Sequence, residues 1–204
     1  MILAVNKPQQ SLTFDQFIQQ LPDEEGRYEL VNGEIMQILP IRKHDNVADF
    51  ITRKLDREVE RLNLKYRVSG RIMIRTVTAN NKEQGRFPDV SVVDKTLWDS
   101  NPFAYSAFVE PLQLAVEVVS TNWEDDYIDK LDEYQRLGIP EYWIVDYLAI
   151  GSRNYLGNPK VPTVFVYLLD EQGVYQSTVF RGTEKIVSKT LPELNITVEQ
   201  ILAA

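Results

Sequence analysis

The sequence predicts an α/β fold, a mixed central β-sheet flanked by helices, and three observations lead to this expectation. Helix-like and strand-like patterns alternate along the 204 residues instead of separating into two blocks. The apolar run at residues 112–120 (LQLAVEVVS) is typical of a strand in the middle of a sheet. A helical stretch at 122–137 then leads to a buried strand at 142–147, and this order predicts parallel pairing through a right-handed crossover.

The N-terminal part of the chain predicts a short helix and then a hairpin. Residues 13–21 carry an apolar stripe, and Thr13 with Gln16 three residues later is typical of a capping box. In the segment 28–38 (YELVNGEIMQI), Asn32-Gly33 favours a tight two-residue turn, because both residues tolerate positive φ.

A long helix and two further strands are expected next. Residues 44–62 repeat apolar side chains at helical spacing and carry charges on the opposite face. Residues 66–76 predict one continuous strand, and residues 88–94 (PDVSVVD) predict another, with a loop at 78–85 between them. The side chains expected on one side of the strand at 66–76 are Arg67, Ser69, Arg71, Met73 and Arg75.

The C-terminal part predicts a helix, a strand, a hairpin and a last helix. The helix at 122–137 is expected to end at Gly138, with Pro140 just beyond it. Residues 163–170 and 173–181 predict a hairpin, which is also a candidate dimer surface, and Val198–Leu202 predicts a short helix. With no repeat and no linker, and with 151–162 expected to be a loop, we expect a single domain over residues 1–204.

Composition excludes several classes of function. The chain has no cysteine, which excludes disulfides and thiolate chemistry and fits a reducing cytoplasm. Its N-terminus lacks the pattern of a signal peptide, and no run is long enough to span a bilayer, so we expect a cytoplasmic protein with no membrane partner. A single histidine and the lack of a phosphate-cradling glycine loop argue against a histidine-rich zinc site and against an organic cofactor.

Two acids in apolar strands point to a metal site. Asp89 opens one predicted strand, and Glu117 lies inside another with apolar residues on both sides. A buried carboxylate is costly unless it is paired, and Mg²⁺ (or Mn²⁺) held by both acids would remove that cost. For Asp89, pairing with a nearby lysine or capping a turn is an equally good interpretation, whereas Glu117 has fewer alternatives.

The helix after Glu117 adds a cation. Asp126 and Lys130 are four residues apart and therefore share a face, with Tyr134 one turn further on. A helix that packs on the strand of Glu117 would bring the Lys130 ammonium close to a metal-bound water, where it would stabilise negative charge. The alternative is a solvated lysine paired only with Asp126.

Several motifs together resemble one protein family. These are YELVNGEI with a histidine, His44, at the head of the long helix, then FPDVSVVD, LAVEVVS, Asp129-Lys130 with Tyr134, and GIPEYWIVD. In this order and spacing, over residues 28–147, they resemble the Uma-two family of restriction endonucleases within the PD-(D/E)XK nuclease superfamily. The resemblance implies a restriction-endonuclease-like fold and a metal-dependent endonuclease that hydrolyses phosphodiesters in DNA.

The resemblance also implies residue roles. Asp89 and Glu117 match the two metal-binding acids of the superfamily. The superfamily lysine two positions after the second acid is replaced here by Val119, and Lys130 on the next helix is expected to take its place. Glu29, in the family's ELxxGE element, is expected to be an outer ligand.

DNA contacts are expected from His44, Lys43, Arg71 and Arg75, because basic side chains neutralise phosphates. A helix-start histidine is equally often a cap, and each cation has a solvated alternative. The net charge of −8 argues against indiscriminate nucleic-acid binding. Cutting both strands of a duplex needs two sites, so a homodimer is expected. The rival functions are an inactive nuclease-fold module that binds DNA, and an interaction protein with no nucleic-acid role.

Overall fold

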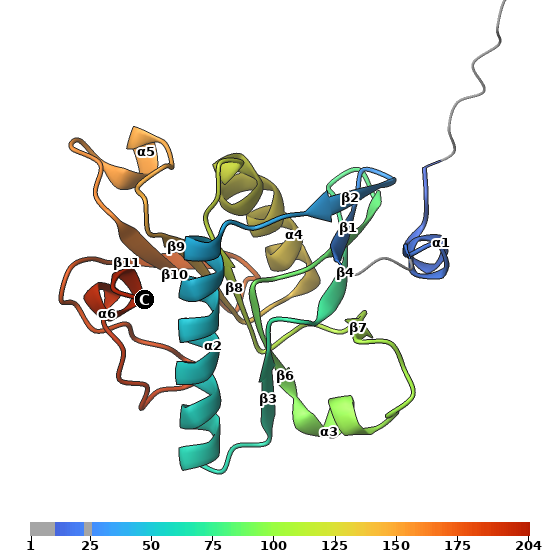
Figure 1. The fold of residues 1–204 in the computed structure, drawn as a ribbon, viewed down its shortest axis with the longest axis horizontal. Helices are drawn as coiled ribbons and strands as arrows, with labels where there is room; N and C mark the ends of the chain where they lie inside the picture. The colour runs from blue at the N-terminus through green and yellow to red at the C-terminus, as the bar shows by residue number, and fades with distance from the viewer. Residues whose placement is uncertain (1–10, 23–25) are drawn as a thin grey trace, which may run out of the picture.

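A mixed six-stranded sheet forms the centre of the fold in a computed structural model that describes residues 11–22 and 26–204 (Figure 1). Its strand order is β11-β10-β9-β8-β6-β3. The members are β3 (Tyr66–Ser69), β6 (Val90–Asp94), β8 (Leu114–Val118), β9 (Glu141–Asp146), β10 (Thr163–Leu169) and β11 (Tyr175–Phe180). β8 and β9 pair in parallel and the other neighbours are antiparallel, which confirms the predicted crossover pairing.

A second, five-stranded sheet has the order β2-β1-β5-β4-β7. Its members are β1 (Arg27–Val31), β2 (Glu34–Ile38), β4 (Met73–Val77), β5 (Glu83–Arg86) and β7 (Ala107–Phe108). The predicted hairpin is β1–β2, and its turn residues Asn32 and Gly33 have φ values of 53° and 89°. The predicted capping box is present at Thr13, where α1 (Phe14–Gln19) begins. α1 packs on β5, where Gly85 leaves room for the Phe17 ring.

Both faces of the six-stranded sheet are covered, and this explains why β8 and β9 carry apolar side chains toward both faces. α2 (Arg42–Arg61) packs on one face with a stripe that includes Val47, Ile51 and Leu55. Each of these side chains is fully buried and contributes about 1.5–3 kcal/mol of hydrophobic stabilisation. The opposite face is covered by a π-helical turn, η1 (Asp125–Asp129), and by α4 (Lys130–Leu137), which continues from it (Figure 1).

Alternation along β8 decides which helix each side chain meets. Leu114, Val116 and Val118 belong to the core beneath α2, whereas Ala115 and Val119 belong to the core beneath α4. Glu117 falls on the α4 side in this alternation. The strand therefore aims its one acid at the helix that carries Lys130.

The predicted strand at 66–76 is wrong in one respect, because it is two strands in different sheets. β3 pairs with β6, and β4 pairs with β5 and β7. The break lies at Gly70, where an added Cβ would be 2.7 Å from the backbone carbonyl oxygen of Asp89. Because of the break, the five side chains expected on one side of a single strand do not form one row. Of these, Met73 is buried.

Two expected loops contain short elements. The segment 78–85 contains most of β5, and 151–162 contains α5 (Arg153–Leu156). The remaining helices are α3 (Lys95–Asp99) and α6 (Val198–Leu202), of which α6 matches its predicted bounds. In the part of the chain that the structure describes, no helix has both the length and the apolar character needed to cross a bilayer.

Candidate active site

A pocket of about 390 Å³ opens beside the C-terminal end of β8. Segments from β1, β2, the start of α2, the loop before β6, the end of β8 and η1 line it. Its acidic lining residues are Glu29, Asp89, Glu117, Asp125 and Asp126. Asp89 and Glu117, far apart in the sequence, thus face one pocket as the sequence predicts.

Asp89 is tied to the strand that carries Glu117. Its Oδ2 accepts a 2.8 Å hydrogen bond from the backbone N–H of Val118, the residue directly after Glu117. The same oxygen lies 3.2 Å from Nε2 of His44, and Oδ1 lies 3.6 Å from the guanidinium of Arg27. The alternative of a lysine-paired or turn-capping Asp89 is therefore not what the structure has.

Glu117 receives donors on both carboxylate oxygens. The Tyr134 hydroxyl donates to Oε1 at 2.5 Å, and the Lys130 ammonium lies 3.0 Å from Oε2. Both donors come from α4, one turn apart. Burial raises the pKa of the Glu117 carboxyl, and the attraction of Lys130 opposes this only in part. The carboxylate is thus in an environment that favours additional positive charge.

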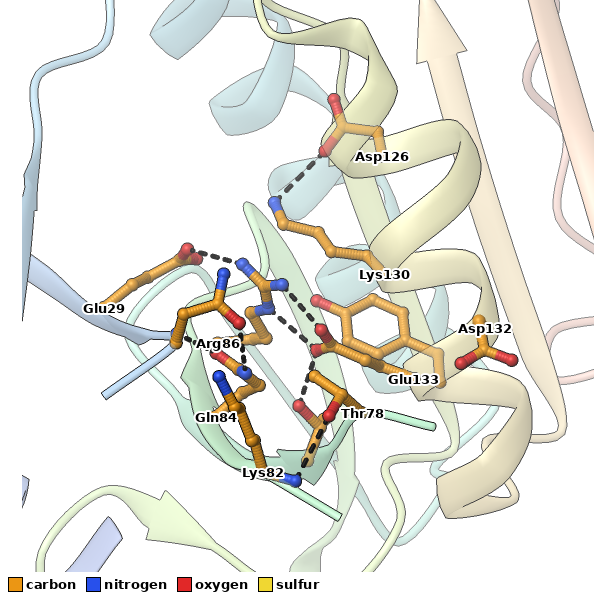
Figure 2. Close-up of polar contacts among 12 residues, drawn as sticks. Glu29, Thr78, Lys82, Gln84, Arg86, Asp126, Lys130, Asp132 and Glu133 are labelled. Carbon is orange, nitrogen blue, oxygen red and sulfur yellow. Dashed lines mark hydrogen bonds and ion pairs between the residues drawn. The ribbon is translucent and has the colours of Figure 1, made fainter. Parts of the chain in front are cut away.

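Lys130 bridges two acids and is almost fully buried. Its Nζ lies 3.0 Å from Glu117 and 3.1 Å from Asp126, so it is not the solvated lysine of the alternative interpretation. Figure 2 shows the contact with Asp126. Burial lowers the pKa of Lys130, but the two carboxylates outweigh it and hold that pKa well above its usual value. Lys130 is therefore an ammonium, fixed at the wall of the pocket.

A second buried ion network supports the helix that carries Lys130. Figure 2 shows the Arg86 guanidinium between Glu29 of β1 and Glu133 of α4. Arg86 donates to both oxygens of Glu133, at 2.8 and 2.6 Å, and Thr76 donates to Glu133 at 2.6 Å. Glu29 lies 3.5 Å from Arg86 and accepts the Phe87 N–H at 2.9 Å. The five-stranded sheet is thereby joined to α4 through charges.

His44 contacts the site acid and does not cap its helix. The N-cap of α2 is Ile41, whereas the buried His44 ring places Nε2 2.7 Å from the Val118 carbonyl oxygen and 3.2 Å from Asp89. Burial lowers the pKa of His44, but its hydrogen bond to Asp89 and the charge of that carboxylate outweigh this, so the pKa is raised. His44 therefore holds Asp89 in place on the side opposite to Lys130.

The other predicted DNA contacts lie outside the pocket lining. Lys43 is exposed, and its ammonium donates to two backbone carbonyl oxygens at the C-terminal end of α6. Arg75 pairs with Glu83 at 2.6 Å, and Arg71 is exposed. The structure thus brings Asp89, Glu117, Lys130, Glu29 and His44 together, but not Lys43, Arg71 and Arg75.

Asp126 lines the pocket, and Arg86 and Glu133 support α4 from outside the pocket lining. The sequence predicts Asp126 only as the partner of Lys130 and predicts no role for Arg86 or Glu133. A usable signal existed for Asp126, which is four residues before Lys130 on the same face. For Arg86 the signal was weak: an arginine just before the FPD motif, in a segment with little apolar patterning.

The donor set and the charge of the pocket fit a divalent cation. The acidic side chains that line it outnumber its lysine and arginine, which are Lys130 and Arg27. Burial also raises the pKa of Asp126, as it does that of Glu117. Within residues 11–22 and 26–204, no group of three or more acidic or histidine side chains is arranged to hold a metal. Two carboxylates with waters and substrate phosphates are nevertheless the usual ligands of Mg²⁺.

Comparisons with known proteins show the family and the fold. A sequence model of the Uma2 family, described as "Putative restriction endonuclease", matches residues 14–199. The fold is similar to that of "a putative nuclease belonging to DUF820" from Anabaena variabilis ATCC 29413, with a TM-score of 0.69 and 18% identity over 94% of this chain and 98% of that chain. At this identity the likeness concerns the fold alone, and it confirms the predicted restriction-endonuclease-like fold. No curated protein matches the chain.

Proposed function

Because the chain belongs to the Uma2 family, we propose that it is a Mg²⁺- or Mn²⁺-dependent endonuclease that hydrolyses phosphodiesters in DNA. The observation that supports this most is one constellation. Asp89 and Glu117 line one pocket, Asp89 accepts the N–H of Val118, the residue directly after Glu117 in β8, and Lys130 lies 3.0 Å from Glu117. Metal-binding acids beside a fixed ammonium are the groups that phosphodiester hydrolysis needs.

Each residue of the constellation has a distinct role in this proposal. Asp89 and Glu117 would hold the cation, which would supply a water of lowered pKa and charge stabilisation at the phosphate. Lys130 would donate to the non-bridging phosphate oxygens as negative charge develops. Asp126 would keep Lys130 at the pocket wall when Glu117 holds the cation. Lys130 thus replaces the lysine that is absent at Val119, whose side chain is fully buried.

Glu29 and His44 are positioning residues in this proposal. Glu29 is held by Arg86 and by the Phe87 N–H, two residues before Asp89, so it fixes the entry into β6. His44 donates toward Asp89 and the Val118 carbonyl, and so orients the first acid. Neither needs to touch the metal to affect the reaction.

One observation favours a second candidate function, an inactive nuclease-fold module that binds DNA. Both oxygens of Glu117 already accept from Tyr134 and Lys130, so this acid is satisfied without a metal. A protein that uses the Glu117–Lys130 ion pair only for stability would keep the fold but would not hydrolyse DNA.

The test is a nicking assay on supercoiled plasmid with Mg²⁺ or Mn²⁺. We expect the protein to produce nicked circles, and we expect Asp89→Asn to abolish this, since it removes one ligand charge and keeps the shape. The matched control is Asp132→Asn, because Asp132 is an exposed acid on α4 (Figure 2) that pairs with the exposed Arg136. Nicking that survives in Asp89→Asn would overturn the proposal. Metal-independent DNA binding without nicking would favour the module.

Cleavage of both strands of a duplex requires two such sites, and we propose that a homodimer supplies them. β11 is an edge strand of the six-stranded sheet, and Val174 and Val179 at this edge are exposed. Sedimentation of the purified protein tests this, because a chain of 23.6 kDa and its dimer separate clearly.

A further inference from the structure

The rim of the pocket is apolar and exposed, in contrast to its charged floor. Met36 of β2, Leu39 and Ile41 from the β2–α2 connection, and Leu148 after β9 all line the pocket. Their exposed fractions are 50%, 79%, 64% and 53%. Single exposed apolar residues need no explanation, but several around one functional pocket indicate a contact surface.

The charges around this rim do not suit the backbone of a continuous duplex. The lysine and arginine that line the pocket are Lys130 and Arg27, and each already faces a carboxylate of the floor. Duplex binding depends mainly on many cation–phosphate contacts, and this mouth offers aliphatic side chains instead. The nearby cation Lys43 is also engaged, with backbone carbonyls at the end of α6.

Apolar side chains beside a cleavage site can contact nucleic acid through the faces of bases. In a duplex these faces are stacked and hidden, whereas an unpaired strand exposes them. Proteins also insert aliphatic side chains such as leucine, isoleucine and methionine against unstacked bases. A base resting on Leu39 and Ile41 would leave its own phosphate free to reach the acids and Lys130 on the floor.

We propose that the rim formed by Met36, Leu39, Ile41 and Leu148 binds the bases of unpaired DNA, so that single-stranded DNA is the preferred substrate. This inference rests on the proposed nuclease function and adds its substrate class. A second copy of this chain is the other candidate occupant. It is disfavoured because a copy seated on the rim would cover the mouth of the catalytic pocket.

The experiment compares one DNA sequence as a single strand and as a duplex. Binding is measured by fluorescence anisotropy without metal, and cleavage is measured separately with Mg²⁺ or Mn²⁺. The variant is Leu39→Ser with Ile41→Ser, and the matched control is Val187→Ser, an equally exposed valine outside the pocket. We expect the single strand to bind and to be cut in preference, and the double variant to bind it about tenfold more weakly, because two aliphatic side chains no longer bury apolar surface against the bases. Val187→Ser should leave both properties unchanged.

The two proposals fail in different ways. Cleavage of the duplex as fast as of the single strand, or single-strand binding unchanged in the double variant, would overturn the rim inference and leave the nuclease proposal standing. Rim-dependent binding of the single strand with no metal-dependent cleavage would support the rim and overturn the nuclease. A dimer that dissociates in the double variant would assign the rim to a second copy and overturn the inference.

Discussion

Lys130 lies at nearly equal distances from Glu117 and Asp126, 3.0 Å and 3.1 Å, on the wall of the pocket. An ammonium with two partners remains in place when one partner turns to another ligand. Asp126 is a residue of η1, and the π-helical turn brings it beside Lys130 at the start of α4. In the proposed reaction Lys130 thus has both a structural and a chemical role, and the two can be separated by experiment.

Replacing Lys130 with methionine is expected to abolish nicking and to destabilise the fold. The change leaves two buried acids without their cation, and breaking such a buried pair costs about 3–5 kcal/mol. The control is Arg136→Met on the same helix, whose exposed pair with Asp132 contributes about 1 kcal/mol or less. Urea denaturation gives the stability, and the plasmid assay gives the activity. If Lys130→Met nicked at the wild-type rate, Lys130 would have no part in the reaction.

Removing the Tyr134 hydroxyl tests whether Glu117 needs a donor to stay in position. Tyr134→Phe leaves Oε1 of the buried Glu117 carboxylate without its donor, which should lower the free energy of unfolding by about 1–3 kcal/mol. We also expect the metal concentration for half-maximal nicking to change, because Glu117 is a proposed metal ligand. Tyr175→Phe is the control, because it also loses one hydroxyl bond, to the Ile139 carbonyl, but does not touch the pocket. An equal stability loss with the same metal dependence in both variants would show that Tyr134 is structural only.

The local elements that a sequence can reveal were predicted well, because their signals are themselves local. The β1–β2 hairpin follows from Asn32-Gly33, and the start of α1 follows from Thr13 with Gln16. The buried strands β8 and β9 were predicted from their largely apolar sequences, which are typical of strands in a sheet that is covered on both faces.

The errors came from features that depend on distant parts of the chain. At the break, Gly70 lies close to the carbonyl of Asp89; a glycine inside a strand pattern is a local signal of such an approach, but residues 66–76 do not indicate which segment approaches. β5 lacks an apolar pattern because Gln84 and Arg86 are buried by long-range partners. Arg86 pairs with Glu133, 47 residues away.

The candidate site was predictable only where its residues have a local signal in the sequence. Asp89 and Glu117 interrupt apolar strands, so the cost of burying them is visible in the sequence. Helical spacing after Glu117 predicted Lys130, and the family motif added Glu29. The predicted DNA contacts Lys43, Arg71 and Arg75 rested on charge alone. The sequence alone does not indicate whether an exposed cation lies on the same surface as the site.

Gly70 is expected to be essential for the position of Asp89. A Cβ at residue 70 would lie 2.7 Å from the Asp89 carbonyl oxygen, a backbone atom that has no rotamer with which to move away. Gly70→Ala should therefore cost about 1–3 kcal/mol through overpacking and should also weaken nicking, because Asp89 shifts relative to the Val118 N–H. The comparison is Gly173→Asn at a φ of 74° with open space around it, which should cost about 1 kcal/mol, because asparagine adopts left-handed backbone more readily than other L residues and no neighbouring atom is in the way. Denaturation and nicking are measured on both variants, and a Gly70→Ala protein as stable and active as the wild type would contradict the close approach of these two segments.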